Sequence, residues 1–398
     1  MIRFSFLLVL GALISLGQGQ ALKVLAASRG INIGCAYKNG GGVGTYNNIL
    51  SREFNGLVGE NNMKWDGLQA VRGNFTFAGA DAMVDFAQQN DMLVRGHTFV
   101  WHQQSGFVAN MPAQATVKAT RDTMFKVMKT HITTVMNRYK GKIYEWDIVN
   151  EAVARDSAGM RLGTGTSSSF WSLRTDAANN NWDFVDSAYV YARQADPDAF
   201  LVYNDYDCEG MGKKSNLVFD LVTRLKAKNL IDGVGLQCHF YVPGTSTGSN
   251  GAFVPSEMIA NLKRLSDLGL RISLTEIDFR VPTPPTSAHL AAQREAYETL
   301  LGICLANPNC KNFFLWGLND GSSWIPQQYP GQGAPLLFND SFNTKPAYAG
   351  LQEVFQIPVA LRASKSGASI LHRTKPWNEV YDLRGRALPV FPVNLPSL

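Results

Sequence analysis

The chain has 398 residues, of which 45% are hydrophobic and 17% charged, a composition typical of a globular protein with a sizeable core. The length suits one large α/β domain or two small ones. The formal net charge of +5 would suit a polyanion, but the segment from Arg362 onward contributes +4 of it, with six Lys or Arg and two Asp or Glu. The rest of the chain is close to neutral and predicts no basic groove, so we expect no nucleic-acid partner.

Residues 1–21 resemble a secretory signal peptide. Arg3 supplies a positive charge, residues 4–16 are apolar, and small residues at Gly17, Gly19 and Ala21 offer cleavage sites. The apolar stretch is too short for a comfortable membrane span, and no other run approaches about 18 apolar residues. We therefore expect a secreted, extracellular protein with no membrane attachment once the signal is removed. The alternative is an uncleaved membrane anchor.

Five cysteines are compatible with an oxidising compartment without requiring one. Cys304 and Cys310 flank a turn-like stretch, which makes a small-loop disulfide plausible. Cys35, Cys208 and Cys238 remain, so at least one thiol stays unpaired. Cys238 stands between Gln237 and His239 in a strand pattern and is expected to be a buried structural thiol that points away from both. No Cys/His spacing is typical of a metal site.

Short apolar runs alternate with longer helical patterns over residues 28–357. The helical patterns include 81–89, 120–139, 184–195 and 216–228. Eight β-then-α units in one chain predict a single (β/α)₈ TIM barrel of the α/β class, spanning residues 22–357. The predicted strands are 31–36, 56–60, 93–98, 143–150, 200–204, 233–239, 271–276 and 313–316.

Polar and aromatic residues gather where these strands end. In a barrel those ends share one face, where active sites are built, so residues two hundred positions apart would meet in one cleft. The alternative is that strand ends are polar only because they meet solvent, but that does not explain the uncharged aromatic and imidazole side chains among them. The strand-end residues are Glu60, Asn61, His97, Asn150, Glu151, Asn204, Asp205, Gln237, His239, Glu276 and Trp316.

Two further segments need a separate interpretation. Residues 40–44 are glycine-rich but lack the spacing of a phosphate-binding loop, so we expect a loop above the first strand and no nucleotide cofactor. Residues 358–398 turn basic, lose helical periodicity and end in a proline-rich stretch. They are interpreted as a basic C-terminal tail outside the barrel. Within it, residues 379–386 faintly resemble part of a sorting module of exported bacterial polysaccharidases.

Glu151 and Glu276 each end an apolar strand-like run. A glutamate there is costly unless it has a partner, which favours a functional interpretation. A pair of carboxylates is also the machinery that cleaves glycosidic bonds, one as acid and the other as nucleophile or base. The alternative is a pair of structural salt bridges to neighbouring arginines.

Several sequence blocks, in order, resemble glycoside hydrolase family 10, the endo-β-1,4-xylanases. The resemblance runs from about Gly34 to Gly350, and seven blocks in order make it highly specific. The blocks are Glu60-Asn-Asn-Met-Lys-Trp65, Arg95-Gly-His-Thr-Phe-Val-Trp-His102, Trp146-Asp-Ile-Val-Asn-Glu151, Tyr203-Asn-Asp-Tyr206, Gly235-Leu-Gln-Cys-His239, Leu274-Thr-Glu-Ile-Asp278 and Phe314-Leu-Trp-Gly-Leu-Asn-Asp-Gly-Ser-Ser-Trp324.

The resemblance implies a retaining, endo-acting hydrolase of β-1,4-xylan. Glu276 would be the nucleophile, kept ionised and oriented by His239 and Asp278. Glu151 would be the acid/base, and Asn150 would hydrogen-bond the 2-hydroxyl of the sugar at the scissile bond.

The resemblance also implies a set of substrate-binding residues. Polar groups would bind sugar hydroxyls, and aromatic rings would pack on the apolar faces of the sugars. The alternatives are core histidines for His97 and His239, a solvated turn for residues 60–64, and core packing for the tryptophans; for Trp316 both interpretations stay open. The implied substrate-binding residues are Glu60, Asn61, Lys64, His97, Trp101, Gln104, Tyr206, Gln237, Trp316 and Trp324.

Departures from the family pattern fall in loops expected to border the cleft, so specificity on the leaving-group side stays open. Ser105-Gly106-Phe107 replaces the usual Pro-Ser-Trp, the glycine-rich loop at 40–44 is unusual, and residues 157–182 are longer than common.

We expect xylan and xylo-oligosaccharides as partners, a monomeric state, and neither cofactor nor metal. Two alternatives stay open: a related hydrolase that prefers cellulose or mannan, and a catalytically dead carbohydrate-binding protein on the same fold.

Overall fold

A computed structural model describes residues 19–38, 44–103, 117–155, 159–161, 169, 171, 182–245, 251–357, 380–381 and 387–388. Most of the expected signal peptide, most of the C-terminal tail, residues 40–43 of the glycine-rich loop, residues 104–107 and most of residues 157–182 lie outside these residues. Within the part of the chain described, no helix combines the length and apolarity needed to cross a membrane.

Eight parallel strands close into a barrel, which confirms the predicted (β/α)₈ fold. The sheet runs from β8 through β6, β5, β4, β3, β2 and β1 to β9, and β9 pairs back onto β8. The strands are β1 (Asn32–Tyr37), β2 (Gly56–Gly59), β3 (Leu93–Val100), β4 (Glu145–Asn150), β5 (Leu201–Asp205), β6 (Gly233–Leu236), β8 (Arg271–Pro282) and β9 (Cys310–Leu315).

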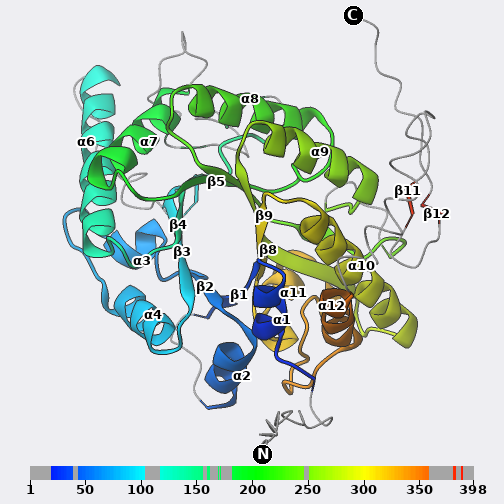
Figure 1. Cartoon of the computed structure of the whole chain (residues 1–398). Helices are drawn as coiled ribbons and strands as arrows, with labels where there is room; N and C mark the ends of the chain where they lie inside the picture. The colour runs from blue at the N-terminus through cyan, green and yellow to red at the C-terminus, as the bar shows by residue number, and fades with distance from the viewer. Residues whose placement is uncertain are drawn as a thin grey trace, which may run out of the picture.

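Helices surround the strands as a ring (Figure 1). Most of them follow a barrel strand and return the chain to the start of the next one, as parallel strands require. The helices are α1 (Leu22–Ser28), α2 (Thr45–Glu53), α3 (Trp65–Gln69), α4 (Ala78–Gln89), α6 (Val117–Arg138), α7 (Asp183–Ala195), α8 (Lys213–Ala227), α9 (Pro255–Asp267), α10 (Ser287–Ala306), α11 (Ile325–Gln328) and α12 (Pro346–Gln356).

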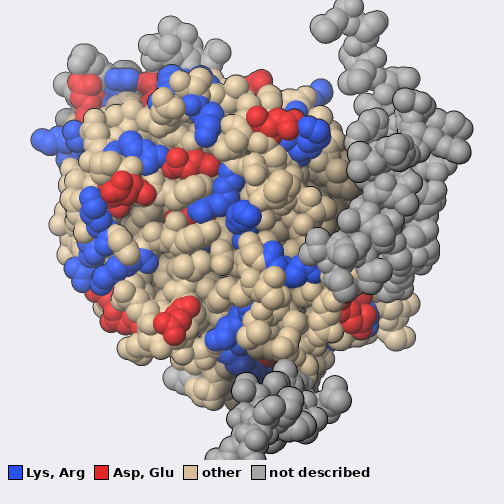
Figure 2. Space-filling view, in the orientation of Figure 1, with Lys and Arg blue, Asp and Glu red and all other residues tan. Residues whose placement is uncertain are grey.

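Short elements complete the described chain. Strands β7 (His239–Tyr241) and β10 (Gln332–Gly333) both pair with β8. A 3₁₀ turn covers Asp320–Ser322, and β11 (Val380–Tyr381) forms a hairpin with β12 (Ala387–Leu388). On the face drawn in Figure 2, the described acidic and basic side chains lie interspersed over the surface.

Among the strand boundaries that differ from the prediction, two shape the site. The predicted strand 233–239 is two strands, because Cys238 adopts a left-handed backbone (φ +63°) between β6 and β7. The predicted strand 271–276 continues to Pro282, so Glu276 lies within β8 instead of ending it. Continuation is possible because the distal half of β8 gains new partners in β7 and β10. Cys238 is buried as expected, but the strand alternation used to predict its direction does not hold there.

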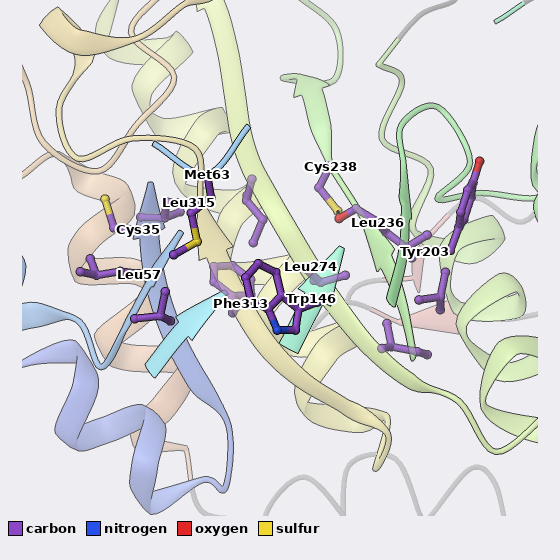
Figure 3. Close-up of a cluster of buried hydrophobic side chains, with 14 of the residues drawn as sticks. Cys35, Leu57, Met63, Trp146, Tyr203, Leu236, Cys238, Leu274, Phe313 and Leu315 are labelled. Atoms are coloured by element: carbon purple, nitrogen blue, oxygen red, sulfur yellow. Dashed lines mark hydrogen bonds between the residues drawn. The ribbon is translucent and has the colours of Figure 1, made fainter. Parts of the chain in front are cut away.

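Apolar packing lies mainly between the strands and the helices. A large buried cluster joins the outward faces of the strands to the helices. Figure 3 shows part of it, including Leu274 of β8 and Phe313 of β9, which are paired in register. Gly96 on β3 makes room for that packing, since a Cβ at this position would lie 1.9 Å from the Trp146 ring. The apolar faces of the helices therefore hold the barrel strands in place.

The barrel interior is largely polar. Glu145 of β4 accepts hydrogen bonds from Ser273 of β8 (2.9 Å) and Asn312 of β9 (3.0 Å). Neither strand neighbours β4, so these bonds cross the lumen. Arg95 of β3 forms ion pairs with both Glu145 and Asp147, and all three side chains are fully buried. A buried charge needs such partners, and the network therefore forms a rigid floor beneath the strand ends.

Cys304 at the end of α10 and Cys310 at the start of β9 form a disulfide, as predicted, while the other three cysteines are buried thiols. The bridge joins a helix to the strand that follows it across a sequence separation of 6. It therefore constrains a tight turn at the end of the barrel opposite the strand carboxyl ends.

Replacing both Cys304 and Cys310 with alanine should lower the free energy of unfolding by about 2 kcal/mol, because the unfolded chain regains the freedom of a short loop. Thermal or denaturant unfolding under non-reducing conditions measures the change. The wild-type protein treated with a reductant is the control and should approach the variant. Unfolding of the variant indistinguishable from that of the oxidised wild type would contradict a stabilising role.

Candidate active site

A pocket of about 340 Å³ opens at the carboxyl ends of the barrel strands. Of the predicted site residues, Gln104 lies outside the described structure and Asp278 lies behind His239; the others reach the pocket wall. The predicted residues that line it are Glu60, Asn61, Lys64, His97, Trp101, Asn150, Glu151, Tyr206, Gln237, His239, Glu276, Trp316 and Trp324.

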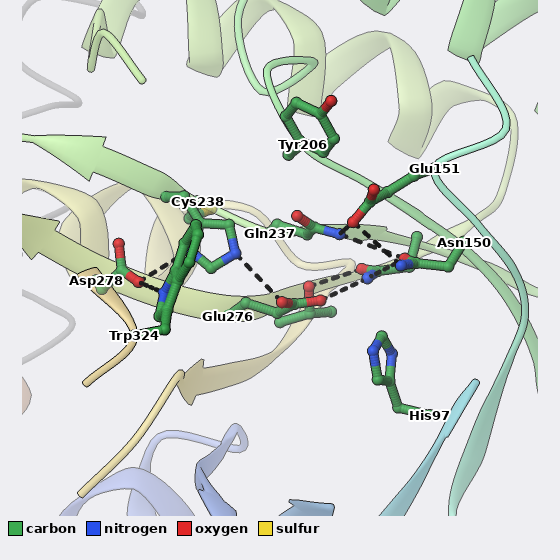
Figure 4. A network of polar contacts seen from close by, with 12 residues as sticks. His97, Asn150, Glu151, Tyr206, Gln237, Cys238, Glu276, Asp278 and Trp324 are labelled. Carbon is green, nitrogen blue, oxygen red and sulfur yellow. Dashed lines mark hydrogen bonds and ion pairs between the residues drawn. The ribbon is translucent and has the colours of Figure 1, made fainter. Parts of the chain in front are cut away.

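Glu151 directly follows β4 and adopts a left-handed backbone (φ +56°), which is unfavourable for a residue with a Cβ. Hydrogen bonds hold it there. Its N–H donates to the carbonyl of Asn204 on β5 (2.9 Å), and its carbonyl accepts from Arg161 Nε (2.6 Å). The next amide, of Ala152, donates to Tyr203 Oη (3.1 Å). This backbone turn directs the Glu151 side chain into the pocket (Figure 4).

Glu276 is held by a donor on each carboxylate oxygen. His239 Nε2 lies 3.2 Å from Oε2, and Asn204 Nδ2 donates to Oε1 at 2.8 Å. The other ring nitrogen of His239 lies 2.9 Å from Asp278 Oδ2, which also accepts from Trp324 Nε1 at 3.0 Å. Figure 4 shows this series of contacts from Trp324 to Glu276. Asp278 thus orients the imidazole toward the carboxylate.

Side-chain amides connect the two glutamates. Asn150 Oδ1 accepts from Asn204 Nδ2 (2.9 Å) and from Gln237 Nε2 (3.3 Å). Gln237 Nε2 and Asn150 Nδ2 donate to Glu151 Oε1, at 3.0 and 3.2 Å. Because Asn204 also donates to Glu276, a continuous set of hydrogen bonds runs from one carboxylate to the other. The separation of the two groups is therefore fixed by the amides between them.

A glycine on the neighbouring strand leaves room for this link. A Cβ at Gly235 of β6 would lie 2.3 Å from Asn204 Oδ1 and 2.9 Å from the Thr275 side chain. In that space Thr275 Oγ1 donates to Asn204 Oδ1 at 2.7 Å, which fixes the amide so that its nitrogen faces Asn150 and Glu276. Only glycine at position 235 is compatible with this arrangement.

The pocket stabilises Glu276 as an anion. Burial by itself would raise the pKa of this carboxyl, but the His239 hydrogen bond and the positive fields of His97, His239 and Lys64 outweigh burial and hold the pKa at about 2. Burial by itself would lower the pKa of His239. The charge and hydrogen bond of Asp278, together with the hydrogen bond to Glu276, instead raise that pKa well above its usual value. Glu276 therefore stays ionised across neutral and moderately acidic pH.

Lys64 brings a positive charge to the pocket wall. It is buried, donates to Asn61 Oδ1 (3.2 Å), and its Nζ lies 4.7 Å from the centre of the Trp101 ring. Burial lowers its pKa, although the charges of Glu276, Glu151 and Glu60 oppose that change. Burial likewise raises the pKa of Glu60. Glu60, Asn61 and Lys64 therefore bring an acid, an amide and a cation to the wall of the pocket.

His97 is held from below by the polar floor of the barrel. Its Nδ1 lies 2.8 Å from Asp147 Oδ2, and Asp147 is in turn paired with Arg95. The prediction left open a core histidine at this position. His97 is buried and satisfied like a core histidine, yet it also lines the pocket. Its field is one of those that lower the pKa of Glu276.

Aromatic rings form another part of the wall. Trp316 is only 8% exposed and packs with Ala36, Val58 and Phe314 inside the barrel, while its remaining surface faces the pocket. Core packing is therefore confirmed for Trp316, and its packing on sugars stays a prediction. Trp324 packs on that cluster and lies edge-on to His239.

The model of glycosyl hydrolase family 10 matches residues 21–354. The chain belongs to this family. Among curated relatives, endo-1,4-beta-xylanase B of Thermotoga neapolitana is 35% identical over 358 residues, covering 88% of this chain and 96% of the relative. Endo-1,4-beta-xylanase 2 of Aureobasidium pullulans is 37% identical, covering 77% of this chain and 82% of the relative.

Solved structures of family-10 enzymes share the fold. Xylanase 10B from Thermotoga maritima superposes with a TM-score of 0.75 at 36% identity, covering 84% of this chain and 98% of that one. Xylanase 10B from Thermotoga petrophila RKU-1, solved in complex with xylobiose, gives 0.77 at 34% identity, covering 86% and 99%. The predicted family membership is thereby confirmed.

Several residues of this family-10 pocket were not predicted as site residues. Asn204 lies among the predicted strand ends and within one family block but was given no role, although it is the amide that joins Asn150 to Glu276. Arg161 binds the Glu151 backbone and donates to Tyr206 Oη (2.8 Å), and nothing in its local sequence indicates that. Further pocket residues outside the prediction are Gln103, Arg155, Asp207, Gln328 and Tyr329.

Among the residues that the structure describes, no group of three or more His, Cys, Asp or Glu side chains is arranged to hold a metal ion. Glu276 is engaged by His239 and Asn204, and Glu151 by side-chain amides and an ion pair with Arg161 (3.9 Å).

Replacing Asp278 with asparagine should raise the pKa of Glu276. The substitution removes the charge that keeps His239 protonated, so a weaker positive field reaches the Glu276 carboxylate. Titration of the carboxyl carbon of Glu276 by ¹³C NMR measures the shift, with Glu276→Gln used to assign the signal. Asp320→Asn, at a partly buried acid outside the pocket, is the control and should leave the Glu276 pKa unchanged. An unaltered Glu276 pKa in Asp278→Asn would contradict this coupling.

Proposed function

We propose that this family-10 hydrolase is a secreted endo-β-1,4-xylanase that cleaves xylan with retention of anomeric configuration. The names of the relatives reported above and the xylobiose complex of the Thermotoga petrophila enzyme support the substrate class. The observation that carries the mechanism is the pair of glutamates in one pocket, with Glu276 ionised and Glu151 joined to it through side-chain amides.

In the first step, Glu276 attacks the anomeric carbon while Glu151 donates its proton to the departing glycosidic oxygen. The C–O bond to the leaving sugar breaks as the bond to the Glu276 oxygen forms, which yields a glycosyl-enzyme. An ionised nucleophile is ready for this attack without proton removal, and the low pKa of Glu276 supports that assignment. We assign Asn150 to the sugar 2-hydroxyl, where a hydrogen bond strengthens in the transition state.

In the second step, Glu151 is the base. It takes a proton from the water that attacks the anomeric carbon, and Glu276 leaves as a carboxylate. Two inversions at the same carbon give net retention. This sequence requires carboxyl groups about 5–5.5 Å apart, whereas an inverting enzyme needs about 6.5–9.5 Å. We propose the short spacing, and His239 with Asp278 as the groups that orient the nucleophile.

The walls of the pocket supply the proposed sugar contacts. Glu60, Asn61 and Lys64 would bind hydroxyls of the next sugar toward the non-reducing end, and Trp316 and Trp324 would pack against pyranose faces. Xylose lacks the hydroxymethyl group of glucose, so aromatic rings close to that edge favour xylan over cellulose. His97, Trp101, Gln104, Tyr206 and Gln237 complete the proposed set. Gln237 donates to Glu151, which supports a position beside the scissile bond.

The remaining proposals concern the whole chain. We place the catalytic domain in residues 22–357, preceded by a signal peptide and followed by a basic tail, and expect a monomer. The family match over residues 21–354 agrees with these limits.

The substrate proposal predicts faster cleavage of xylan than of cellulose or mannan under identical conditions, with mainly short xylo-oligosaccharides as products. Reducing-sugar release from a panel of soluble polysaccharides measures the preference. Glu276→Ala serves as the inactive control. Faster release from cellulose or mannan would overturn the substrate, and binding of xylo-oligosaccharide without any release would favour the carbohydrate-binding alternative.

The mechanism predicts different losses at the two glutamates. Glu276→Ala should remove nearly all activity on any substrate. Glu151→Ala should impair xylan cleavage but still form a glycosyl-enzyme from aryl xylosides, whose leaving group needs no proton. Azide should then restore turnover and give a β-configured azide product. Proton NMR of the wild-type reaction should show a β-configured first product, and an α-configured one would refute Glu276 as nucleophile.

A further inference from the structure

The proposed catalytic glutamates share one supporting segment, formed by Gln237, Cys238 and His239 and called here the 237–239 corner. Gln237 donates from its side chain to Glu151 Oε1 (3.0 Å), and its carbonyl accepts from the Glu276 N–H (3.0 Å). His239 contacts the Glu276 carboxylate. Any movement of this corner therefore displaces partners of both carboxylates (Figure 4).

The corner has a backbone that its sequence does not favour. Cys238 is fully buried and adopts φ +63°, a left-handed conformation that is unfavourable for a residue with a side chain. It interrupts the sheet between β6 and β7. The corner therefore needs external contacts to persist.

The Cys238 N–H has its partner outside the sheet. The preceding amide, of Gln237, still pairs with the carbonyl of Asp205 at the end of β5 (3.0 Å). At Cys238 the partner is Glu209 Oε1, at 2.8 Å, and the carboxylate is only 5% exposed. A buried N–H without an acceptor is unfavourable, so this single contact satisfies the residue at the centre of the corner.

Glu209 is itself held from α9. Asn261 Nδ2 donates to the carbonyls of Cys208 (2.8 Å) and Glu209 (3.0 Å), which fixes the loop after β5. Burial and the nearby charge of Asp207 raise the pKa of Glu209 to about 7, although the bond from Cys238 and the charge of Lys214 oppose that rise. Either protonation state retains a carbonyl-type oxygen that can accept from Cys238.

We propose that Glu209 is a positioning residue for the reaction: by accepting the Cys238 N–H it holds the left-handed corner that aligns Gln237 on Glu151 and His239 on Glu276. Glu209 does not line the pocket, and it acts only through the corner. The inference rests on the proposed function, because it assumes that these two glutamates carry the chemistry.

The test compares three variants. Glu209→Met fills a similar volume but removes the acceptor, whereas Glu209→Gln keeps an amide oxygen. Glu53→Met is the matched control, because Glu53 is also buried and its Oε2 accepts the backbone N–H of Leu22 at 3.0 Å, away from the pocket. The readouts are kcat and KM on a nitrophenyl xylobioside, the pKa of Glu276 by ¹³C NMR, and thermal unfolding.

Glu209→Met should lower kcat at least about tenfold with little change in KM, and should raise the pKa of Glu276 by about one unit as His239 loses its alignment. Glu209→Gln should stay close to wild type in both. Glu53→Met should lower only the unfolding temperature. Wild-type kcat and Glu276 pKa in Glu209→Met would overturn the proposal, as would equal changes in Glu53→Met.

Glycine at the corner gives a second test. Glycine adopts φ +63° without steric cost, so Cys238→Gly should restore part of the kcat lost in Glu209→Met. A folded double variant no better than Glu209→Met would overturn the proposed route through the corner. If Glu209→Met does not fold, Glu209→Asp carries the test, because it withdraws the carboxylate by one methylene; wild-type values there would also overturn it.

Failure of the proposed function gives a different result. A wild-type enzyme that does not cleave the xylobioside contradicts the catalytic assignment, whatever the variants do. The Glu276 pKa is measured without turnover, so it still decides whether Glu209 sets the alignment of His239.

Discussion

Burying an ionised carboxylate is unfavourable unless hydrogen bonds and opposite charge replace its hydration. In this pocket, much of the polar lining provides that replacement for Glu276. The carboxylate is only 4% exposed. Asn204 from β5 and His239 from β7 each supply a donor, and positive fields from His97, His239 and Lys64 act in the same direction. These groups come from β5, β7, β3 and the segment after β2, so an anionic Glu276 depends on closure of the barrel.

The same requirement explains the polar interior beneath the pocket. His97 can face the pocket because Asp147 engages its other ring nitrogen, and Asp147 is fixed by the buried ion pair with Arg95. Glu145 joins this group to β8 and β9 across the lumen. Buried hydrogen bonds and ion pairs from four strands hold this group in one arrangement, which makes the floor rigid. Rigidity there limits how far the strand ends, and with them the pocket side chains, can move.

Strained backbone accompanies the functional groups. Glu151 and Cys238 both have left-handed φ values, and both depend on contacts from other elements: Arg161 and Asn204 for Glu151, and Glu209 for Cys238. At Glu151 the unusual backbone directs the residue's own side chain into the pocket. At Cys238 it places the neighbouring side chains of Gln237 and His239 there. Such conformations persist because surrounding hydrogen bonds over-determine them. The local sequence alone would not favour the backbone at Glu151 or at Cys238. Contacts from other elements therefore decide how the side chains around them point into the pocket.

The sequence by itself determined the barrel, because the repeated alternation of apolar runs and helical patterns has few other solutions. It also singled out Glu151, Glu276, His239 and most pocket residues, because strand ends in a barrel share one face and the family blocks contain them. It did not determine where β6 ends or that β8 continues beyond Glu276. Those boundaries depend on pairing with β7 and β10, which are neighbours only in space.

The connections between functional groups were likewise decided by the tertiary structure. Asn204 joins Asn150 to Glu276, and Glu209 meets Cys238, across separations of tens of residues. Local sequence patterns reveal the chemical type of each side chain and the periodicity of apolar residues. A hydrogen bond, by contrast, requires two groups within about 3 Å in the right direction. Only the closed barrel fixes that distance, and so only the tertiary structure decides which buried polar residues act together.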